Sequence, residues 1–179
     1  ESLLRLRSDL GGIYFDLGDA EAVRREFAAR SDELRPYDVD GFLIQHQAAP
    51  GVATVIATVE DALFGPVVSF GLGGVATDLL NDRGYRIPPL TDVDVDDLMR
   101  SPRAAPLLFG ARGSDPVDVA SLRDLLARVA QMSDDLPEVA SLTLRPVVVA
   151  PTGTAVLGAT VRLAHPLSRT DRTARRLLG

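Results

Sequence analysis

A short glycine-rich segment is the first part of the chain whose residue types suggest chemistry. Residues 70–82 read FGLGGVATDLLND, and Gly71, Gly73 and Gly74 stand between an apolar run and a possible short helix. Backbone N–H groups in such a turn can bind phosphate. The full spacing of a dinucleotide-binding motif is absent, and the chain has no lysine to complete a phosphate-binding loop. A phosphate cradle and a plain tight turn both remain open.

Carboxylates and histidines give weaker signals. Asp78 and Asp82 follow the glycines and are candidate ligands, although acidic residues near a helix start are also ordinary caps. Four aspartates farther on lack the glycine and distal glutamate of a calcium loop, which favours a solvated helix start: Asp92, Asp94, Asp96 and Asp97. His46 lies in an apolar run and is expected to be a hydrogen-bonded interior residue. With His165 as the second of two histidines, little material exists for a histidine metal site or a catalytic triad.

Composition excludes several further classes. All 19 basic residues are arginine, so no lysine can form a Schiff base, and the absence of cysteine removes disulfides and thiolate metal sites. The net charge of −6 and the scattered arginines argue against a nucleic-acid partner. No apolar run approaches the roughly 20 residues that span a bilayer, and no secretory signal pattern is present. We therefore expect a cytoplasmic protein with no membrane partner.

Hydrophobic patterning predicts an α+β fold. Three helices are expected: residues 19–35 after an Asp19 cap, a short helix from a Thr91–Asp94 capping box to about residue 101, and a long amphipathic helix over residues 114–136. Apolar and β-branched runs predict strands at residues 11–17, 41–47, 51–60, 66–72, 138–150 and 154–164. The last two strands are joined by a short turn and should pair antiparallel. A mixed, mostly antiparallel sheet with flanking helices follows.

Five segments in this order resemble the ATP-grasp module of NDP-forming acyl-CoA synthetases. They are RSDLGGIYFDL, FLIQHQAAPGV, FGPVVSFGLGGVATDLLNDRGYRIPPLT, RAAPLLFGARGSDPVDVASLRDLL and DDLPEVASLTLRPVVV, and the resemblance runs from about Arg7 to Leu163. It implies an ATP-grasp-like fold, with ATP and Mg²⁺ as cofactors of active members. Such modules normally start earlier, so the upstream part of the module is expected to be missing. We expect a partial ATP-grasp domain at residues 1–165 and an arginine-rich C-terminal tail at 166–179.

The chain departs from the pattern of this family at its functional positions. The phosphate-carrying histidine and its lysine neighbour are replaced by Leu6 and Arg7, and a customary glutamate by Ala53. The positions that the resemblance assigns to metal binding hold no carboxylate: Ser141, Arg145 and Gly158. A guanidinium about 4 Å from the ion would repel a single positive charge by about 4 kcal/mol at an effective dielectric constant near 20. We therefore expect neither metal nor cofactor in this chain.

Three functional hypotheses follow from the resemblance. In the first, the chain is a degenerate, non-catalytic module that regulates or scaffolds a larger protein, with the glycines, Arg112 and Arg145 as candidate contacts to a nucleotide or acyl-CoA. The segment ATVRLAHPLSRTDRTARRLLG also resembles the end of actinobacterial-type fusions between a GNAT acetyltransferase and a synthetase-like region. Expected partners are thus CoA-binding, ligase and GNAT domains of that protein. The second hypothesis is an active subunit that makes acyl-CoA from acid, CoA and ATP, and the third is a structural interface module.

Arg145 itself has two interpretations. It can be a surface arginine that packs its aliphatic stem against the strand, or a cation that replaces the metal and holds a phosphate directly.

Overall fold

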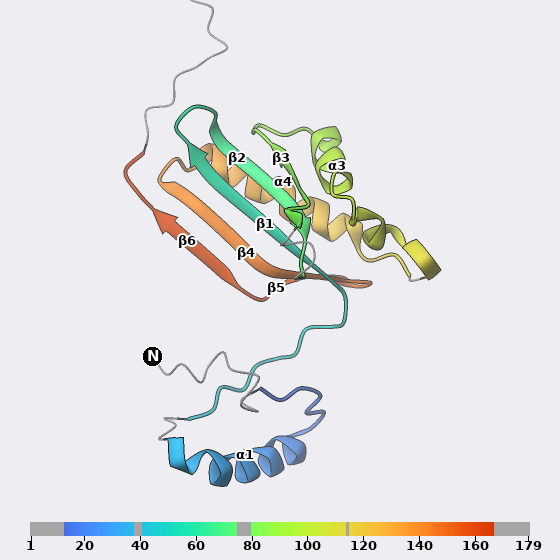
Figure 1. Ribbon diagram of the computed structural model, residues 1–179, viewed down its shortest axis with the longest axis vertical. Helices are drawn as coiled ribbons and strands as arrows, with labels where there is room; N and C mark the ends of the chain where they lie inside the picture. Colours follow the sequence, from blue (N-terminus) through green and yellow to red (C-terminus); the bar gives the residue numbers. More distant parts are fainter. Residues whose placement is uncertain (1–12, 38–40, 75–79, 114, 167–179) are drawn as a thin grey trace, which may run out of the picture. The chain divides into compact units, whose positions relative to one another are not determined.

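The computed structural model describes residues 13–37, 41–74, 80–113 and 115–166, with the side chains of Tyr37 and Arg112 left out. The chain divides into two compact units, one up to Gln47 and one from Ala48 onward. Each unit has its own secondary structure and is described separately (Figure 1). None of the helices in the described ranges is long and apolar enough to cross a membrane.

The first unit is built on one helix, α1 (Ala20–Leu34), followed by the 3-10 turn η3 (Arg35–Tyr37). The Asp19 side chain accepts a hydrogen bond from the Ala22 backbone N–H at 2.7 Å, as the sequence predicts for an N-cap. No side chain of α1 is buried.

The prediction of two strands in this unit is wrong for the described residues. Residues 13–17 and 41–47 adopt no regular strand structure. A strand requires a hydrogen-bonded neighbour, and these segments are instead joined by side-chain bonds. Asp16 N–H donates to Gln47 Oε1 at 2.7 Å, and Gln47 Nε2 donates to Asp16 Oδ1 at 2.8 Å. The apolar, β-branched composition of these segments predicted strands, but the segments lack the backbone hydrogen-bond ladder of a sheet.

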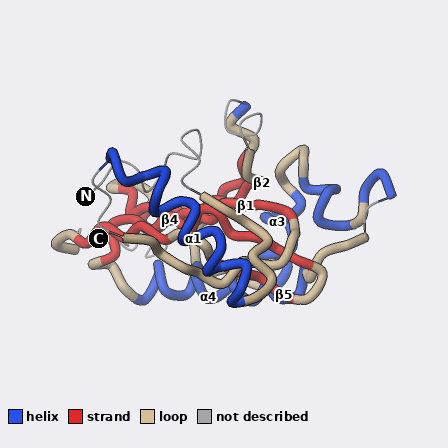
Figure 2. Tube along the Cα trace, turned by 90° about the horizontal axis from the view of Figure 1, so that it is seen from below, coloured by secondary structure: helices blue, strands red, loops and turns tan. Residues whose placement is uncertain are grey.

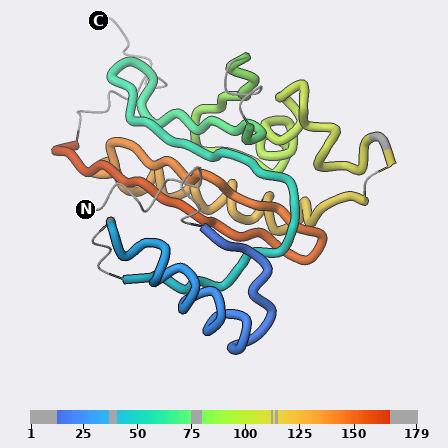
Figure 3. The backbone as a smooth tube through the Cα atoms, turned by 60° about the horizontal axis from the view of Figure 1, so that its bottom comes forward, coloured from blue at the N-terminus to red at the C-terminus, as the bar shows by residue number. Residues whose placement is uncertain are grey.

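The second unit is a six-stranded antiparallel sheet with helices on one face. Its strands, in chain order, are β1 (Val52–Asp61), β2 (Gly65–Leu72), β3 (Arg83–Arg86), β4 (Val139–Ala150), β5 (Gly153–Val156) and β6 (Ala159–Leu163). The spatial order is β3-β2-β1-β4-β5, and β6 also pairs with β4. In Figure 3, β4 (orange) lies between β1 (teal) and the red C-terminal strands. The predicted antiparallel pairing of the last two β-rich segments is confirmed.

Two details of this sheet differ from the sequence prediction. The segment 154–164, expected as one strand, is interrupted at Leu157 and Gly158 and forms β5 and β6. The short, polar strand β3 was not predicted at all. Its sequence RGYR has no apolar run, and it is a strand because Phe70 and Ser69 of β2 pair with it.

Two helices cover one face of the sheet. Helix α3 (Asp92–Arg100) begins with the predicted capping box, in which Thr91 and Asp94 satisfy each other's backbone N–H groups. Helix α4 (Val119–Asp135) begins later than predicted because Asp118 caps it, accepting the Ser121 N–H at 3.0 Å. Figure 2 shows α4 running along one side of the strands. Two 3-10 turns, η4 (Ala105–Phe109) and η5 (Ala111–Gly113), lie between the helices in sequence.

The core lies between this helical layer and the sheet. The predicted α4 stripe is confirmed, since Leu122, Leu126 and Val129 are buried while Leu125 and Met132 are partly buried. They pack with fully buried sheet residues such as Ile56, Val68, Phe70 and Val147. Outside this core, Arg123 of α4 donates to Asp96 of α3 at 2.7 Å. The opposite face of the sheet carries no helix among the described residues of this unit.

Candidate functional site

The two positions predicted to matter most, Arg145 and Gly158, lie directly opposite each other. Arg145 N–H donates to the Gly158 carbonyl at 2.8 Å, and Leu157 N–H donates to the Pro146 carbonyl at 2.9 Å. A Cβ atom built on Gly158 would lie 2.4 Å from the Arg145 carbonyl oxygen. The structure therefore brings the two residues together. The Arg145 backbone lies where a side chain at position 158 would begin.

Ser141 lies on the same strand as Arg145 and on the same side of the sheet. The intervening Leu142 and Leu144 are buried toward the helices, so alternation directs Ser141 and Arg145 to the helix-free face. Four residues of strand separate them by about 13 Å. Ser141 pairs with Val59 of β1 on one side and with Arg162 of β6 on the other. This part of the face thus presents a hydroxyl and two guanidinium groups.

A magnesium ion does not fit these residues. Mg²⁺ needs oxygen ligands in near-octahedral geometry, and the three positions supply one hydroxyl, one cation and a glycine. In the described part of the chain, no group of three or more histidine or acidic side chains could hold a metal ion. These three positions alone therefore do not supply the ligands of a magnesium ion.

The glycines of the FGLGG segment have packing roles. A Cβ atom at Gly71 would lie 2.8 Å from the Asp82 carbonyl oxygen, and one at Gly73 would lie 3.2 Å from the Cβ of Ala53. Gly73 N–H also donates to the Ala53 carbonyl at 2.7 Å. Ala53, the position of the family's glutamate, is therefore neighbour to this turn. Gly74 adopts a φ of 130°, a conformation that favours glycine.

The remaining candidates are dispersed. Arg112 belongs to η5, while Leu6, Arg7 and Asp78 lie outside the described residues. Asp82 caps the segment after α3, accepting the backbone N–H groups of Arg103 and Ala104 at 2.8 and 3.0 Å. His46 is exposed, so the expectation of an interior histidine was wrong, because the strand that would have buried it does not form.

The acidic cluster of α3 is structural, as expected. Hydrogen bonds from the Thr91 side chain and backbone lower the pKa of Asp94 below its ordinary value. The hydrogen bond from Arg123 likewise lowers the pKa of Asp96. Both carboxylates are held ionised by these partners, which serve the start of α3 and its contact with α4.

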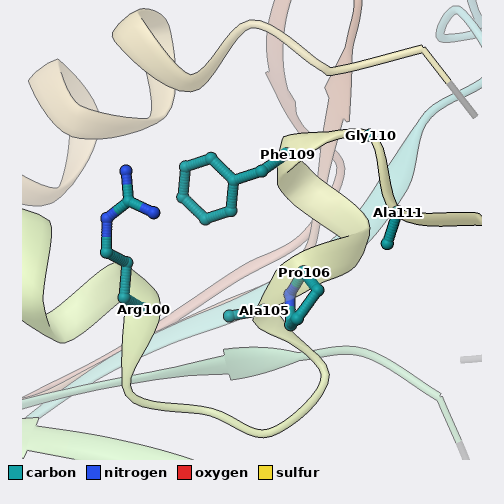
Figure 4. Close-up of a pocket in the computed structure, with 6 residues that line it drawn as sticks. All are labelled: Arg100, Ala105, Pro106, Phe109, Gly110 and Ala111. Carbon is teal, nitrogen blue, oxygen red and sulfur yellow. The ribbon is translucent and has the colours of Figure 1, made fainter.

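A recess at the end of α3 was not predicted from the sequence. Arg100, the last residue of that helix, places its guanidinium over the ring of Phe109 in η4, 4.1 Å from the ring centroid (Figure 4). An arginine and an aromatic residue nine positions apart, separated by prolines, carry no periodic signal. The turn between them, which only the structure shows, brings the two together.

Comparison with known proteins matches this chain and its fold to one family. Residues 2–163 match the family model described as an ATP-grasp domain. The chain is 32% identical over 145 residues to the Acetate–CoA ligase [ADP-forming] I subunit beta of Pyrococcus furiosus, covering 79% of this chain and 62% of that protein. It is 33% identical over 154 residues to Acetate–CoA ligase [ADP-forming] I of Archaeoglobus fulgidus, covering 84% of this chain and 22% of the relative.

Solved structures show the same relationship. The acetyl-coenzyme A synthetase 1 of Ca. Korarchaeum cryptofilum, in complex with coenzyme A and Mg-AMPPCP, superimposes with a TM-score of 0.72 at 34% identity. The match covers 88% of this chain and 70% of that one. The chain therefore spans roughly three fifths of the beta subunit and about a fifth of the longer ligase. The chain belongs to the ATP-grasp domain family, in the group found in ADP-forming acetate–CoA ligases.

Proposed function

We propose that this chain is a non-catalytic ATP-grasp module that regulates or scaffolds a larger acyl-CoA synthetase-like protein. The observation that carries the proposal is the trio Ser141, Arg145 and Gly158, which offers no carboxylate where the family resemblance expects metal ligands. Phosphoryl transfer depends on Mg²⁺ to neutralise charge on the phosphates. Without that ion, the module keeps the fold of its family but not the chemistry.

Backbone geometry supports this proposal. The close approach of Arg145 O to the Cβ direction of Gly158 leaves no room for a ligand-bearing side chain there without a backbone shift. Replacing the glycine is thus disfavoured by packing, while the neighbouring guanidinium disfavours a bound cation.

The helix-free face of the sheet is the proposed ligand surface. Arg145 on β4 and Arg162 on β6 are directed to that face, and Arg162 stands opposite Ser141 in the β4–β6 register. Arginine can bind a phosphate through two parallel hydrogen bonds and needs no metal to do so. A nucleotide or the phosphates of an acyl-CoA would bind here directly, as a signal rather than a substrate.

The larger protein is proposed to contain the remaining parts of the family's machinery. The ligase relatives act on acetate by name, and the solved relative binds coenzyme A and Mg-AMPPCP. CoA-binding and ligase domains, and a GNAT acetyltransferase domain as suggested by the C-terminal resemblance, are the partners that we propose. The module would report ligand binding to such domains.

Calorimetry with ATP tests this proposal in the full chain. Titrations are run with EDTA and, separately, with excess Mg²⁺, for the native chain and for Arg145→Gln. We expect Mg²⁺ to give no gain in affinity, and we expect Arg145→Gln to weaken binding about tenfold, because a charge-assisted hydrogen bond is lost. Arg128→Gln, an exposed arginine of α4 paired with Asp124, is the matched control and should bind as the native chain does. Mg²⁺-dependent binding that survives Arg145→Gln contradicts the proposal.

Two alternatives have their own support. Family membership favours an active subunit, in which oxygen ligands from other residues replace those missing at the trio. Formation of acetyl-CoA from acetate, CoA and ATP above a heat-inactivated control would establish it. The packed Gly71 and Gly73 favour instead a structural interface module, which would bind neither ATP nor CoA in the same titrations.

A further inference from the structure

A small recess opens where α3 ends and η4 begins. It has a volume of about 340 Å³ and is lined by Arg100, Ala105, Pro106, Phe109, Gly110 and Ala111. A space of this size is in the range that accommodates small organic ligands. Helix α3 and η4 form it, so it is separate from the strands that carry Arg145.

Arg100 supplies a cation at this recess, and its guanidinium packs against the Phe109 ring. The Arg100 guanidinium lies 4.1 Å from the centroid of the Phe109 ring, and Figure 4 shows the two groups facing each other from α3 and η4. Asp96, one turn earlier, accepts a hydrogen bond from Arg123 at 2.7 Å, and its carboxylate also interacts electrostatically with Arg100. The ring packs against the guanidinium carbon, and a guanidinium donates its hydrogen bonds within its own plane.

The other walls are apolar and small. Ala105 is buried, and Pro106 and Ala111 add only carbon side chains. Gly110 adopts a φ of 84°, a conformation that favours glycine. No side chain therefore fills the recess at this position. Arg100 is accordingly the charged side chain among the six lining residues.

We propose that this recess binds a monocarboxylate carrying a small apolar or aromatic group. The carboxylate would take the in-plane N–H groups of Arg100 in a bidentate pair, and the carbon portion would occupy the apolar walls beside Phe109. One cation and a recess of this size match a single negative charge on a small molecule. A phosphate or a dianion would bring charge that these walls do not balance.

Titration of the ¹⁵N-labelled full chain tests this site by NMR. The probes are phenylacetate, which has ten non-hydrogen atoms, and phenylacetamide, its uncharged counterpart. We expect phenylacetate to shift the amide signals of Arg100, Phe109 and Gly110, and to bind at least about tenfold more tightly than the amide, because only the acid forms the ion pair. Binding that is equal for acid and amide, or shifts elsewhere only, overturns the proposal.

Variants separate the site from general effects. Arg100→Gln should remove the preference for the acid, and Phe109→Leu should weaken both probes while leaving that preference. Arg100→Lys, which keeps the charge but not the planar fork, should retain part of the preference. Arg103→Gln is the matched control, an exposed arginine three residues farther on that does not line the recess. If Arg100→Gln disturbs the fold, as a changed ¹⁵N spectrum would show, the lysine variant decides; loss of selectivity in Arg103→Gln would refute the assignment.

Discussion

Arg145 and Gly158 are joined by a backbone hydrogen bond of 2.8 Å, and the Arg145 carbonyl oxygen occupies the space in which a Gly158 side chain would begin. The two residues therefore depend on each other through backbone packing, independently of any ligand. A substitution at position 158 acts first on the pairing of β4 with the segment between β5 and β6.

Gly158→Ala should destabilise the chain by about 1–3 kcal/mol, the usual cost of overpacking. The added Cβ must displace backbone, since its contact at 2.4 Å is with a carbonyl oxygen and not with a flexible side chain. Thermal denaturation followed by circular dichroism measures the loss. Gly41→Ala, at a glycine with nothing within 4 Å of its Cβ direction, is the matched control and should be nearly neutral. Equal stability of both variants would contradict the close approach.

Restoring a single ligand should not create a magnesium site. Arg145→Asn removes the cation and adds one amide oxygen, but Mg²⁺ binding needs several oxygen ligands and position 158 cannot supply one without strain. We expect calorimetry to detect no Mg²⁺ binding to this variant. Gly158→Asp, alone or combined with Arg145→Asn, should lower the melting temperature. We expect this loss of stability to outweigh any gain in Mg²⁺ affinity. Tight Mg²⁺ binding by the single Asn variant would show that other oxygen ligands are already in place.

Thr91→Ala should cost about 1 kcal/mol, because it removes the side-chain half of the capping box of α3. The Thr91 hydroxyl accepts the Asp94 N–H at 3.3 Å, and Asp94 Oδ2 accepts the Thr91 N–H at 2.8 Å. Thr91→Ser keeps the hydroxyl and should keep most of the stability. Urea denaturation of the three proteins, compared at one pH, separates the hydroxyl from the methyl group.

Stability should fall in acid partly through Asp96. The Arg123 hydrogen bond lowers the folded-state pKa of Asp96 from its ordinary value of 3.8, so its stabilising contribution is present above that value. The contribution is lost as the pH falls through the lowered pKa. Asp96→Asn should therefore be less stable than the native chain at neutral pH, with the difference narrowing at the acid end. Asp97→Asn, one residue farther on and exposed, is the control. Its difference in stability from the native chain should not show the same narrowing in acid.

Local signals in the sequence predicted most of the second unit. The Thr91–Asp94 capping box and the Leu122–Met132 stripe were correct because capping and helical periodicity act over a few residues. Strands β1, β2 and β4 were found because their apolar, β-branched runs are typical of strands that a sheet buries. The start of α4 was misplaced by five residues, since the capping choice of Asp118 over earlier residues is not visible in periodicity.

Features that depend on distant residues could not be predicted. Strand β3 exists because β2 lies beside it, and the break between β5 and β6 lies opposite Arg145 of another strand. Residues 41–47 show the converse, because a β-rich composition without a neighbouring strand produced no ladder and left His46 exposed. At the site, the resemblance indicated which positions to compare. Their adjacency followed from the predicted pairing of the last two β-rich segments, whereas the meeting of Arg100 with Phe109 came only from the folded arrangement.

The side chains of helix α1 are all at least partly exposed. Packing therefore gives its backbone amides little protection from hydrogen exchange. Its amide hydrogens can exchange with solvent through fraying of a single helix, since no core has to open first. The amides of β1, which has β2 on one side and β4 on the other, exchange only when the sheet separates. Deuterium uptake should therefore resolve into a fast class in α1 and a slow class in the central strands, within one and the same polypeptide.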